Sequence, residues 1–99
     1  MFFARFFRRP RPRSDLHVTL FTRQGCHLCD DAEALLIKAQ ARHRFVMETK
    51  DVDASPEWAA AYGDCVPVVL VNGKVRFRGK VNEVLLQRIL DHEAMSKND

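Results

Sequence analysis

Cysteine is scarce in this chain, and long apolar runs are missing from it. Three cysteines among 99 residues are too few, and odd in number, for the disulfide framework of a small secreted domain. No apolar stretch approaches the ~18 residues that a membrane-spanning helix needs. Arginines interrupt the phenylalanines of residues 1–13, MFFARFFRRPRPR, where a secretory signal has an unbroken apolar core. We therefore expect a cytoplasmic protein in a reducing environment, without a membrane span.

Acidic residues are nearly absent from the first fifteen positions, where Asp15 stands against five arginines. The rest of the chain holds 11 basic and 12 acidic residues, a net charge of −1. The basicity belongs to the N-terminal segment, so it does not predict a domain that binds nucleic acid. Pro10, Pro12 and the dense arginines predict a disordered extension over residues 1–14. The alternative is a segment that lies on an anionic membrane or grips nucleic acid.

Strand and helix signals alternate through the remainder and predict one domain, residues 15–94, with a polar tail at 95–99. β-Branched and aromatic residues predict four strands, at 16–22, 44–49, 67–71 and 74–78. The last two strands flank Asn72-Gly73, a dipeptide typical of tight antiparallel hairpins.

Three helices are expected around these strands, at 26–42, at 56–62 after a Ser55 cap, and from about Asn82 onward. Their apolar faces are expected to include Leu35, Leu36, Ile37, Val81, Val84, Leu85, Leu86, Ile89 and Leu90. The order strand, helix, strand, helix, strand, strand, helix predicts an α/β fold with a four-stranded mixed sheet. Its first two strands should be parallel through a right-handed crossover.

Cys26 and Cys29 fall where the first predicted strand passes into a helix, and the spacing places their sulfurs about one turn apart. The N–H groups of a helix's first turn have no partners within the helix, so they and the helix dipole stabilise a thiolate at Cys26. A thiolate is the species that attacks disulfides. His27 adds positive charge when it is protonated, whereas Asp30 and Asp31 oppose it. The position of the pair favours redox chemistry.

Other interpretations of the two cysteines stay open at this point. The alternatives are two small core residues, two ligands of a zinc site, or ligands of a metal or iron–sulfur cluster shared between two chains. A zinc site needs four ligands, and the chain has no second CxxC, so Cys65 and a histidine would have to complete the set. A further hypothesis is a non-catalytic binding module that the arginine-rich extension directs to a membrane or an acidic partner.

The string FTRQGCHLC, residues 21–29, resembles the active-site opening of glutaredoxins: an aromatic residue, Thr or Ser, a basic residue, proline, glycine, then CxxC. Residues 65–68, Cys-Val-Pro-Val, resemble the Val-Pro step of thioredoxin-fold proteins. The resemblance spans residues 16–92 with a matching element order, and it is closest to a divergent group of short bacterial glutaredoxin-like proteins. It implies a thioredoxin-like fold.

The resemblance also implies a thiol–disulfide oxidoreductase in which Cys26 attacks and Cys29 resolves the mixed disulfide. Pro67 would be cis, and the backbone of Val66 would pair with the substrate as an added strand. Cys65 is expected to approach the same face. We take it as a loop cysteine without a role, against the alternatives of a second disulfide or a metal ligand.

Glutathione recognition is the feature in which the chain departs from glutaredoxins. Arg23 occupies the position of the basic residue that meets a glutathione carboxylate, and His27 and Gly79 are also expected to contact the substrate. His-Leu replaces the usual Pro-Tyr between the cysteines, Gln24 replaces a proline, and the second glutathione motif keeps only Gly79 and Glu83. These departures favour a disulfide-containing protein as substrate. We expect a monomer with no bound cofactor or metal, and glutathione, or its mixed disulfide, as the alternative reaction partner.

Overall fold

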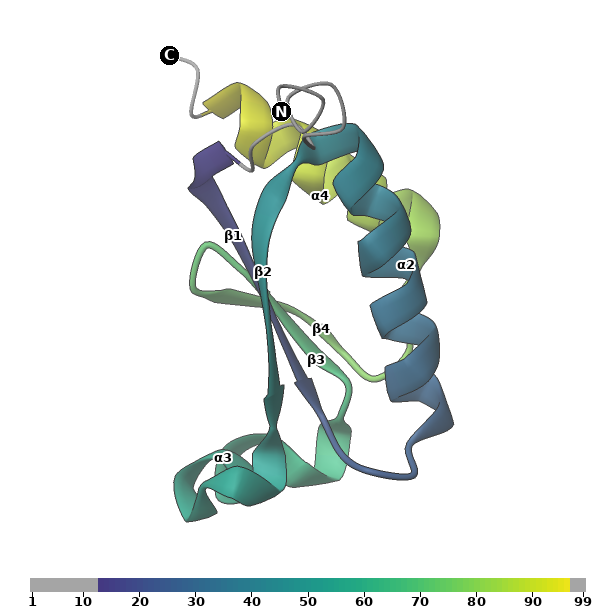
Figure 1. The fold of residues 1–99 in the computed structure, drawn as a ribbon, viewed down its shortest axis with the longest axis vertical. Helices are drawn as coiled ribbons and strands as arrows, with labels where there is room; N and C mark the ends of the chain where they lie inside the picture. Colours follow the sequence, from purple (N-terminus) through teal and green to yellow (C-terminus); the bar gives the residue numbers. More distant parts are fainter. Residues whose placement is uncertain (1–12, 97–99) are drawn as a thin grey trace, which may run out of the picture.

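The structure is a computed structural model that describes residues 13–96 of the chain. The elements follow one another as β1 (Arg13–Thr22), α2 (His27–His43), β2 (Phe45–Asp51), η1 (Val52–Ala54), α3 (Pro56–Tyr62), η2 (Gly63–Cys65), β3 (Val68–Val71), β4 (Lys74–Arg78) and α4 (Glu83–Ser96). The four strands form one sheet in the order β2-β1-β3-β4 (Figure 1). β1 and β2 are parallel, and the other neighbours are antiparallel. The predicted element order and the mixed sheet are confirmed.

The bounds of the first two strands differ from the sequence prediction. β1 begins at Arg13, inside the predicted extension, because Arg13 pairs with Phe45 at the start of β2. β2 continues to Asp51, which pairs with Thr22 at the end of β1. The predicted extension otherwise lies outside the described residues, as does the tail beyond Ser96.

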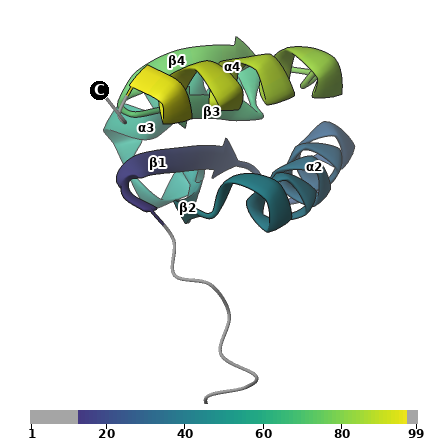
Figure 2. The ribbon, with the colours of Figure 1, turned by 90° about the horizontal axis from the view of Figure 1, so that it is seen from above.

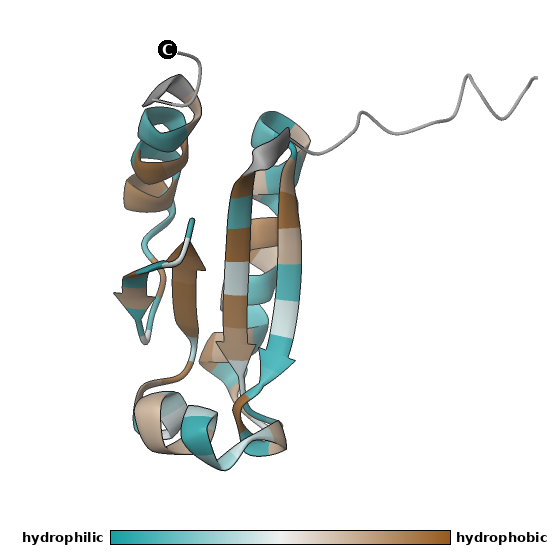
Figure 3. Cartoon of the chain, turned by 90° about the vertical axis from the view of Figure 1, so that its left-hand side faces the viewer, coloured by the Kyte–Doolittle hydropathy of each residue, from teal (hydrophilic) through white to brown (hydrophobic). Residues whose placement is uncertain are grey.

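Helices α2 and α4 cover one face of the sheet, and α3 packs against one end of the other face (Figures 1 and 2). Side chains alternate between the two faces along a strand, so Leu20 enters the larger core while Phe21 points the other way. Phe21 meets Trp58 and Tyr62 of α3, with ring centroids 5.4 and 4.7 Å away. Figure 3 shows α2 behind β1 and β2, and α3 across the lower ends of the strands.

The predicted apolar faces of the helices were too broad. Ile37, Val84 and Leu85 are 56%, 64% and 46% exposed. The buried positions recur mainly at three- and four-residue steps, and they are Cys29, Ala32, Leu36 and Ala39 in α2 and Leu86, Ile89 and Leu90 in α4. Ile37 and Leu85 are each one residue, and so about 100°, from a buried leucine, and they face solvent. Within residues 13–96, none of the helices is long and apolar enough to cross a membrane.

Asn72 ties the β3–β4 hairpin to β1 and to α4. Its φ is 51° and that of Gly73 is 83°, the conformation that a two-residue hairpin turn requires. Its side-chain oxygen accepts from the His17 N–H at 2.9 Å, and its amide nitrogen donates to Glu93 at 3.0 Å. The His17 carbonyl accepts in turn from the backbone N–H of Asn72 at 2.8 Å.

We expect Asn72→Ala to lower the free energy of unfolding by about 2–3 kcal/mol, because it loses both side-chain bonds and the tolerance for positive φ. Asn72→Gly keeps the backbone conformation, so it should lose only about 1–2 kcal/mol. Urea denaturation followed by circular dichroism measures both values. Equal stability of both variants and the parent protein would contradict this role for Asn72.

Candidate active site

The loop between β1 and α2 presents the first cysteine at the start of the helix. Gly25 has a φ of 80°, which lets the chain turn sharply out of β1. Cys26 is the N-cap of α2, with φ −100° and ψ 109°, and its sulfur accepts a hydrogen bond from the Cys29 N–H at 3.1 Å. The Cys26 N–H donates to the Arg23 carbonyl at 3.2 Å, which fixes the loop. A backbone donor of the first helical turn therefore points at this sulfur, as expected for a site that stabilises a thiolate.

The two cysteine sulfurs are paired as a disulfide. Their Cα atoms lie 5.2 Å apart, inside the range of about 4.4–6.8 Å that disulfides require. Cys26 is half-buried, whereas Cys29 is only 2% exposed. His27 and Leu28 between them are exposed, and Cys26 is the more accessible of the two cysteines.

The Val66–Pro67 segment lies at the same end of the sheet as the cysteines, beside the end of β1. Its peptide bond is cis, as the resemblance to thioredoxin-fold proteins implied. β3 starts directly after Pro67, and its first residue, Val68, pairs with Phe21 near the end of β1. The end of β1 leads into the cysteine loop. Gly79 also belongs here, because its N–H donates to the Pro67 carbonyl at 2.7 Å.

Arg23 ties the cysteine loop to the segments on either side of α3. Its Nε and Nη2 atoms each donate to an Asp53 carboxylate oxygen at 3.0 Å, and Nη1 donates to the Gly63 carbonyl at 3.0 Å. A Cβ at Gly63 would lie 2.9 Å from Arg23 Nη2, so a larger residue there would make the guanidinium shift. The hydrogen bond from Arg23 holds the pKa of the Asp53 carboxyl below its ordinary value of 3.8. The pair is therefore intact at neutral pH and breaks only as the pH falls through that lowered value.

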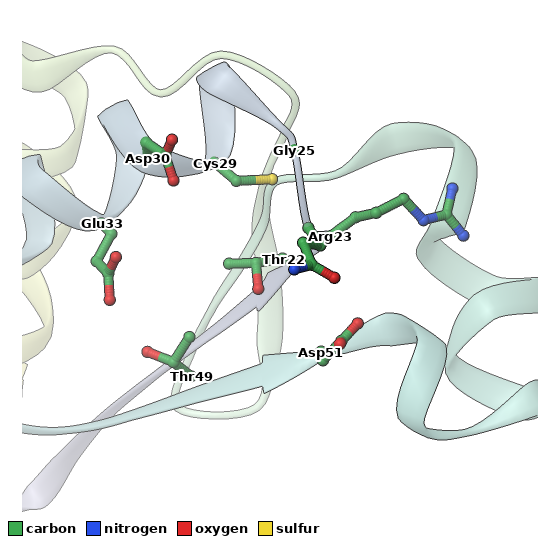
Figure 4. A pocket seen from close by; sticks show the side chains of 9 residues that line it. Thr22, Arg23, Gly25, Cys29, Asp30, Glu33, Thr49 and Asp51 are labelled. Carbon is green, nitrogen blue, oxygen red and sulfur yellow. The ribbon is translucent and has the colours of Figure 1, made fainter.

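A polar cavity of about 460 Å³ adjoins the buried cysteine. It lies between the first turns of α2 and the ends of β1 and β2, and it is lined by Thr22, Arg23, Gln24, Gly25, Cys29, Asp30, Glu33, Thr49 and Asp51 (Figure 4). Three of these residues carry carboxylates and two carry hydroxyls. Glu33 falls four residues after Cys29 in the predicted helix, but nothing in the sequence pattern connected Thr49 or Asp51 with the cysteines.

Cys65 is half-buried and is not part of the disulfide. Arg78 of β4 places its Nη1 atom 3.6 Å from the Cys65 sulfur. Among the side chains that the structure describes, no three His, Cys, Asp or Glu residues are grouped so that they hold a metal ion.

Comparison with known proteins identifies the family. The glutaredoxin-like domain family (DUF836) matches residues 17–91, so the chain belongs to this family. An uncharacterized protein of Mycobacterium tuberculosis is 35% identical over 71 residues, which cover 67% of this chain and 73% of that protein.

Solved structures give the same fold. A protein of X. campestris superposes with a TM-score of 0.64 at 29% identity, covering 76% of this chain and 96% of that one. A variant thioredoxin from Halobacterium salinarum superposes with a TM-score of 0.66 at 21% identity, covering 82% of this chain and 76% of that one. The fold is thioredoxin-like, and the paired Cys26 and Cys29 occupy a site suited to redox chemistry.

Proposed function

We propose that this protein is a thiol–disulfide oxidoreductase that reduces disulfide bonds in other proteins. The observation that carries the proposal is the different placement of two paired sulfurs. Cys26 is accessible at the start of α2 and accepts a backbone N–H, whereas Cys29 is buried behind it. Such an arrangement suits one sulfur for attack on a substrate and the other for release of the product.

The proposed reaction has two exchanges. The Cys26 thiolate attacks one sulfur of the substrate disulfide, forms a mixed disulfide and releases the other substrate sulfur as a thiolate. Cys29 then attacks the Cys26 sulfur, which releases the second substrate sulfur and leaves the Cys26–Cys29 disulfide. Two electrons pass from the protein to the substrate. We assign to the backbone of Val66, next to Pro67 at this end of the sheet, the pairing with an extended substrate segment. His27, which is exposed beside Cys26, is assigned to the surface that contacts the substrate.

The contacts of Arg23 favour a protein disulfide over a glutathione mixed disulfide. Its Nε, Nη1 and Nη2 atoms all donate hydrogen bonds within the protein, to Asp53 and to the Gly63 carbonyl. A glutathione carboxylate would have to compete with Asp53 for this guanidinium. We therefore assign Arg23 mainly to positioning the cysteine loop.

Asp53→Ala is expected to raise the rate at which the reduced protein removes glutathione from a glutathionylated peptide, because Arg23 becomes available to a substrate carboxylate. The expected gain is about two- to fivefold, the size of effect that exposed charge pairs produce. Asp64→Ala removes the same charge near Arg23 without removing a hydrogen bond, and it serves as the matched control. An unchanged or lower rate in Asp53→Ala would contradict the competition between Asp53 and glutathione.

A single-turnover experiment tests the proposed function without an electron donor. The fully reduced protein is mixed with a small disulfide-bonded protein, and mass spectrometry follows both partners after rapid acid quenching. We expect one substrate disulfide to be reduced for each chain that loses two hydrogen atoms at Cys26 and Cys29. If the protein binds or ignores the substrate while both of its thiols stay reduced, the oxidoreductase proposal is wrong.

A further inference from the structure

The Cys29 thiol is buried, and it needs a partner that takes up its proton. This inference rests on the proposed function. In the second exchange the Cys29 thiol has to lose its proton before its sulfur attacks Cys26. Cys29 is 2% exposed, and burial disfavours the charged form of a thiol. The backbone N–H of Cys29 donates to the Cys26 sulfur, so it stabilises charge on Cys26 and not on Cys29. The reaction therefore needs a proton acceptor near Cys29.

The polar cavity beside Cys29 provides a route for this proton. Its volume of about 460 Å³ has room for several water molecules, each of which occupies about 30 Å³ in the liquid. Thr22 and Thr49 face it from β1 and β2 with hydroxyl groups that donate and accept hydrogen bonds (Figure 4). Water in this space is able to connect the Cys29 sulfur with the carboxylates on the wall.

The charged groups at this cavity differ in how well they suit the task. Arg23 is a cation and is bound to Asp53. The Asp51 carboxylate is exposed and accepts from the Asp53 N–H at 2.9 Å, where it caps the turn after β2. Asp30 is exposed and follows Cys29 directly, so it is turned by about 100° around α2.

Glu33 is the carboxylate that fits best. It follows Cys29 by four residues, so it lies on the same face of α2, one turn further along. It is half-buried, and its carboxylate makes no hydrogen bond or ion pair to another residue in the described part of the chain. Figure 4 shows Glu33 reaching from α2 toward the strand that carries Thr49.

We propose that Glu33 accepts the proton of Cys29, through water in this cavity, when the mixed disulfide is resolved. The proton moves from the Cys29 sulfur to the Glu33 carboxylate, and the Cys29 thiolate forms a bond with the Cys26 sulfur. The bond between Cys26 and the substrate sulfur breaks, and its electron pair leaves with the substrate thiolate. Glu33 then returns the proton to solvent or to the departing thiolate, and no further reactant is required.

An aromatic disulfide that releases coloured thionitrobenzoate separates the two exchanges. Attack by Cys26 releases the first thionitrobenzoate, and attack by Cys29 on the mixed disulfide releases the second. The full-length chain carries Cys65→Ser in every variant, so that its third thiol does not add a signal. Stopped-flow absorbance then measures one rate for each cysteine.

Glu33→Gln is expected to leave the first phase unchanged and to slow the second by about a hundredfold or more at pH 7, as expected for the loss of a general base. The second phase of the parent should change little between about pH 6 and 8. In Glu33→Gln it should rise about tenfold per pH unit, because hydroxide must then remove the proton. Glu33→Asp keeps the carboxylate and should recover part of the rate.

A carboxylate outside the cavity serves as the control for Glu33. Glu48→Gln removes an exposed carboxylate from β2 on the opposite face to Thr49, and it should alter neither phase. An unchanged second phase in Glu33→Gln, equal slowing of both phases, or the same slowing in Asp51→Asn would overturn the assignment to Glu33. If the parent releases no thionitrobenzoate from Cys26, the proposed function itself fails, and this inference falls with it.

Discussion

Cys26→Ser is expected to reduce disulfide reduction to the rate without protein, because a serine hydroxyl does not form the nucleophile that attacks a disulfide. Cys29→Ser should still attack the substrate through Cys26, but the mixed disulfide should persist because the second sulfur is missing. Mass spectrometry after acid quenching measures the mixed disulfide directly. The different burial of the two sulfurs is the reason that the two variants should fail at different steps.

Cys65→Ser is the matched control, since it removes the one described cysteine outside the disulfide. It should retain the activity of the parent protein within about twofold, because Cys65 takes no part in the two proposed exchanges and serine is close to cysteine in size. A loss in Cys65→Ser as large as that in Cys26→Ser would contradict the division of roles between Cys26 and Cys29. It would also give Cys65, which contacts Arg78, a part in the reaction.

Leu36→Ala should lower the free energy of unfolding by about 2–5 kcal/mol, the usual cost of removing a fully buried leucine side chain. Leu36 is 0% exposed and lies where α2 packs on the sheet. A domain of this size has a total stability of about 5–15 kcal/mol, so the change would remove a large part of it. Urea denaturation monitored by circular dichroism gives the value.

Ile37→Ala provides the control at the next position of the same helix. The two side chains are isomers, and the substitutions remove the same atoms, but Ile37 is 56% exposed. We expect a loss below about 1 kcal/mol there, because little packing is lost and alanine favours the helix. Similar losses for both variants would mean that α2 does not bury the face described above.

Local signals predicted most of the element order. Asn72-Gly73 marked the hairpin, and the Ser55 and Asn82 side chains cap their helices, accepting from Trp58 and Leu85 N–H groups at 3.4 and 2.9 Å. These features were predictable because each depends on a few neighbouring residues. The position of Cys26 at the start of α2 was predictable for the same reason. The cis peptide at Pro67 followed from the family resemblance and not from spacing.

Features that depend on long-range packing could not be predicted in this way. Arg23 contacts Asp53 and Gly63, which are 30 and 40 residues away, and the sequence pattern contains no signal for either contact. The exposure of Ile37 and Val84 depends on which face of each helix packs on the sheet. The cavity beside Cys29 forms only where α2 packs beside β2, because Glu33 of α2 and Thr49 of β2 both line it.

The redox equilibrium of Cys26 and Cys29 distinguishes a reversible dithiol–disulfide pair from two unrelated thiols. The protein is equilibrated in buffers of varied glutathione redox ratio, its free thiols are trapped by rapid alkylation, and peptide masses report each cysteine. We expect Cys26 and Cys29 to lose and regain their thiols together, in one reversible two-electron transition, and reduced Cys26 to be alkylated faster than Cys29 or Cys65. Two thiols that stay reduced across all buffers, or that oxidise independently of each other, would contradict a redox role for the pair.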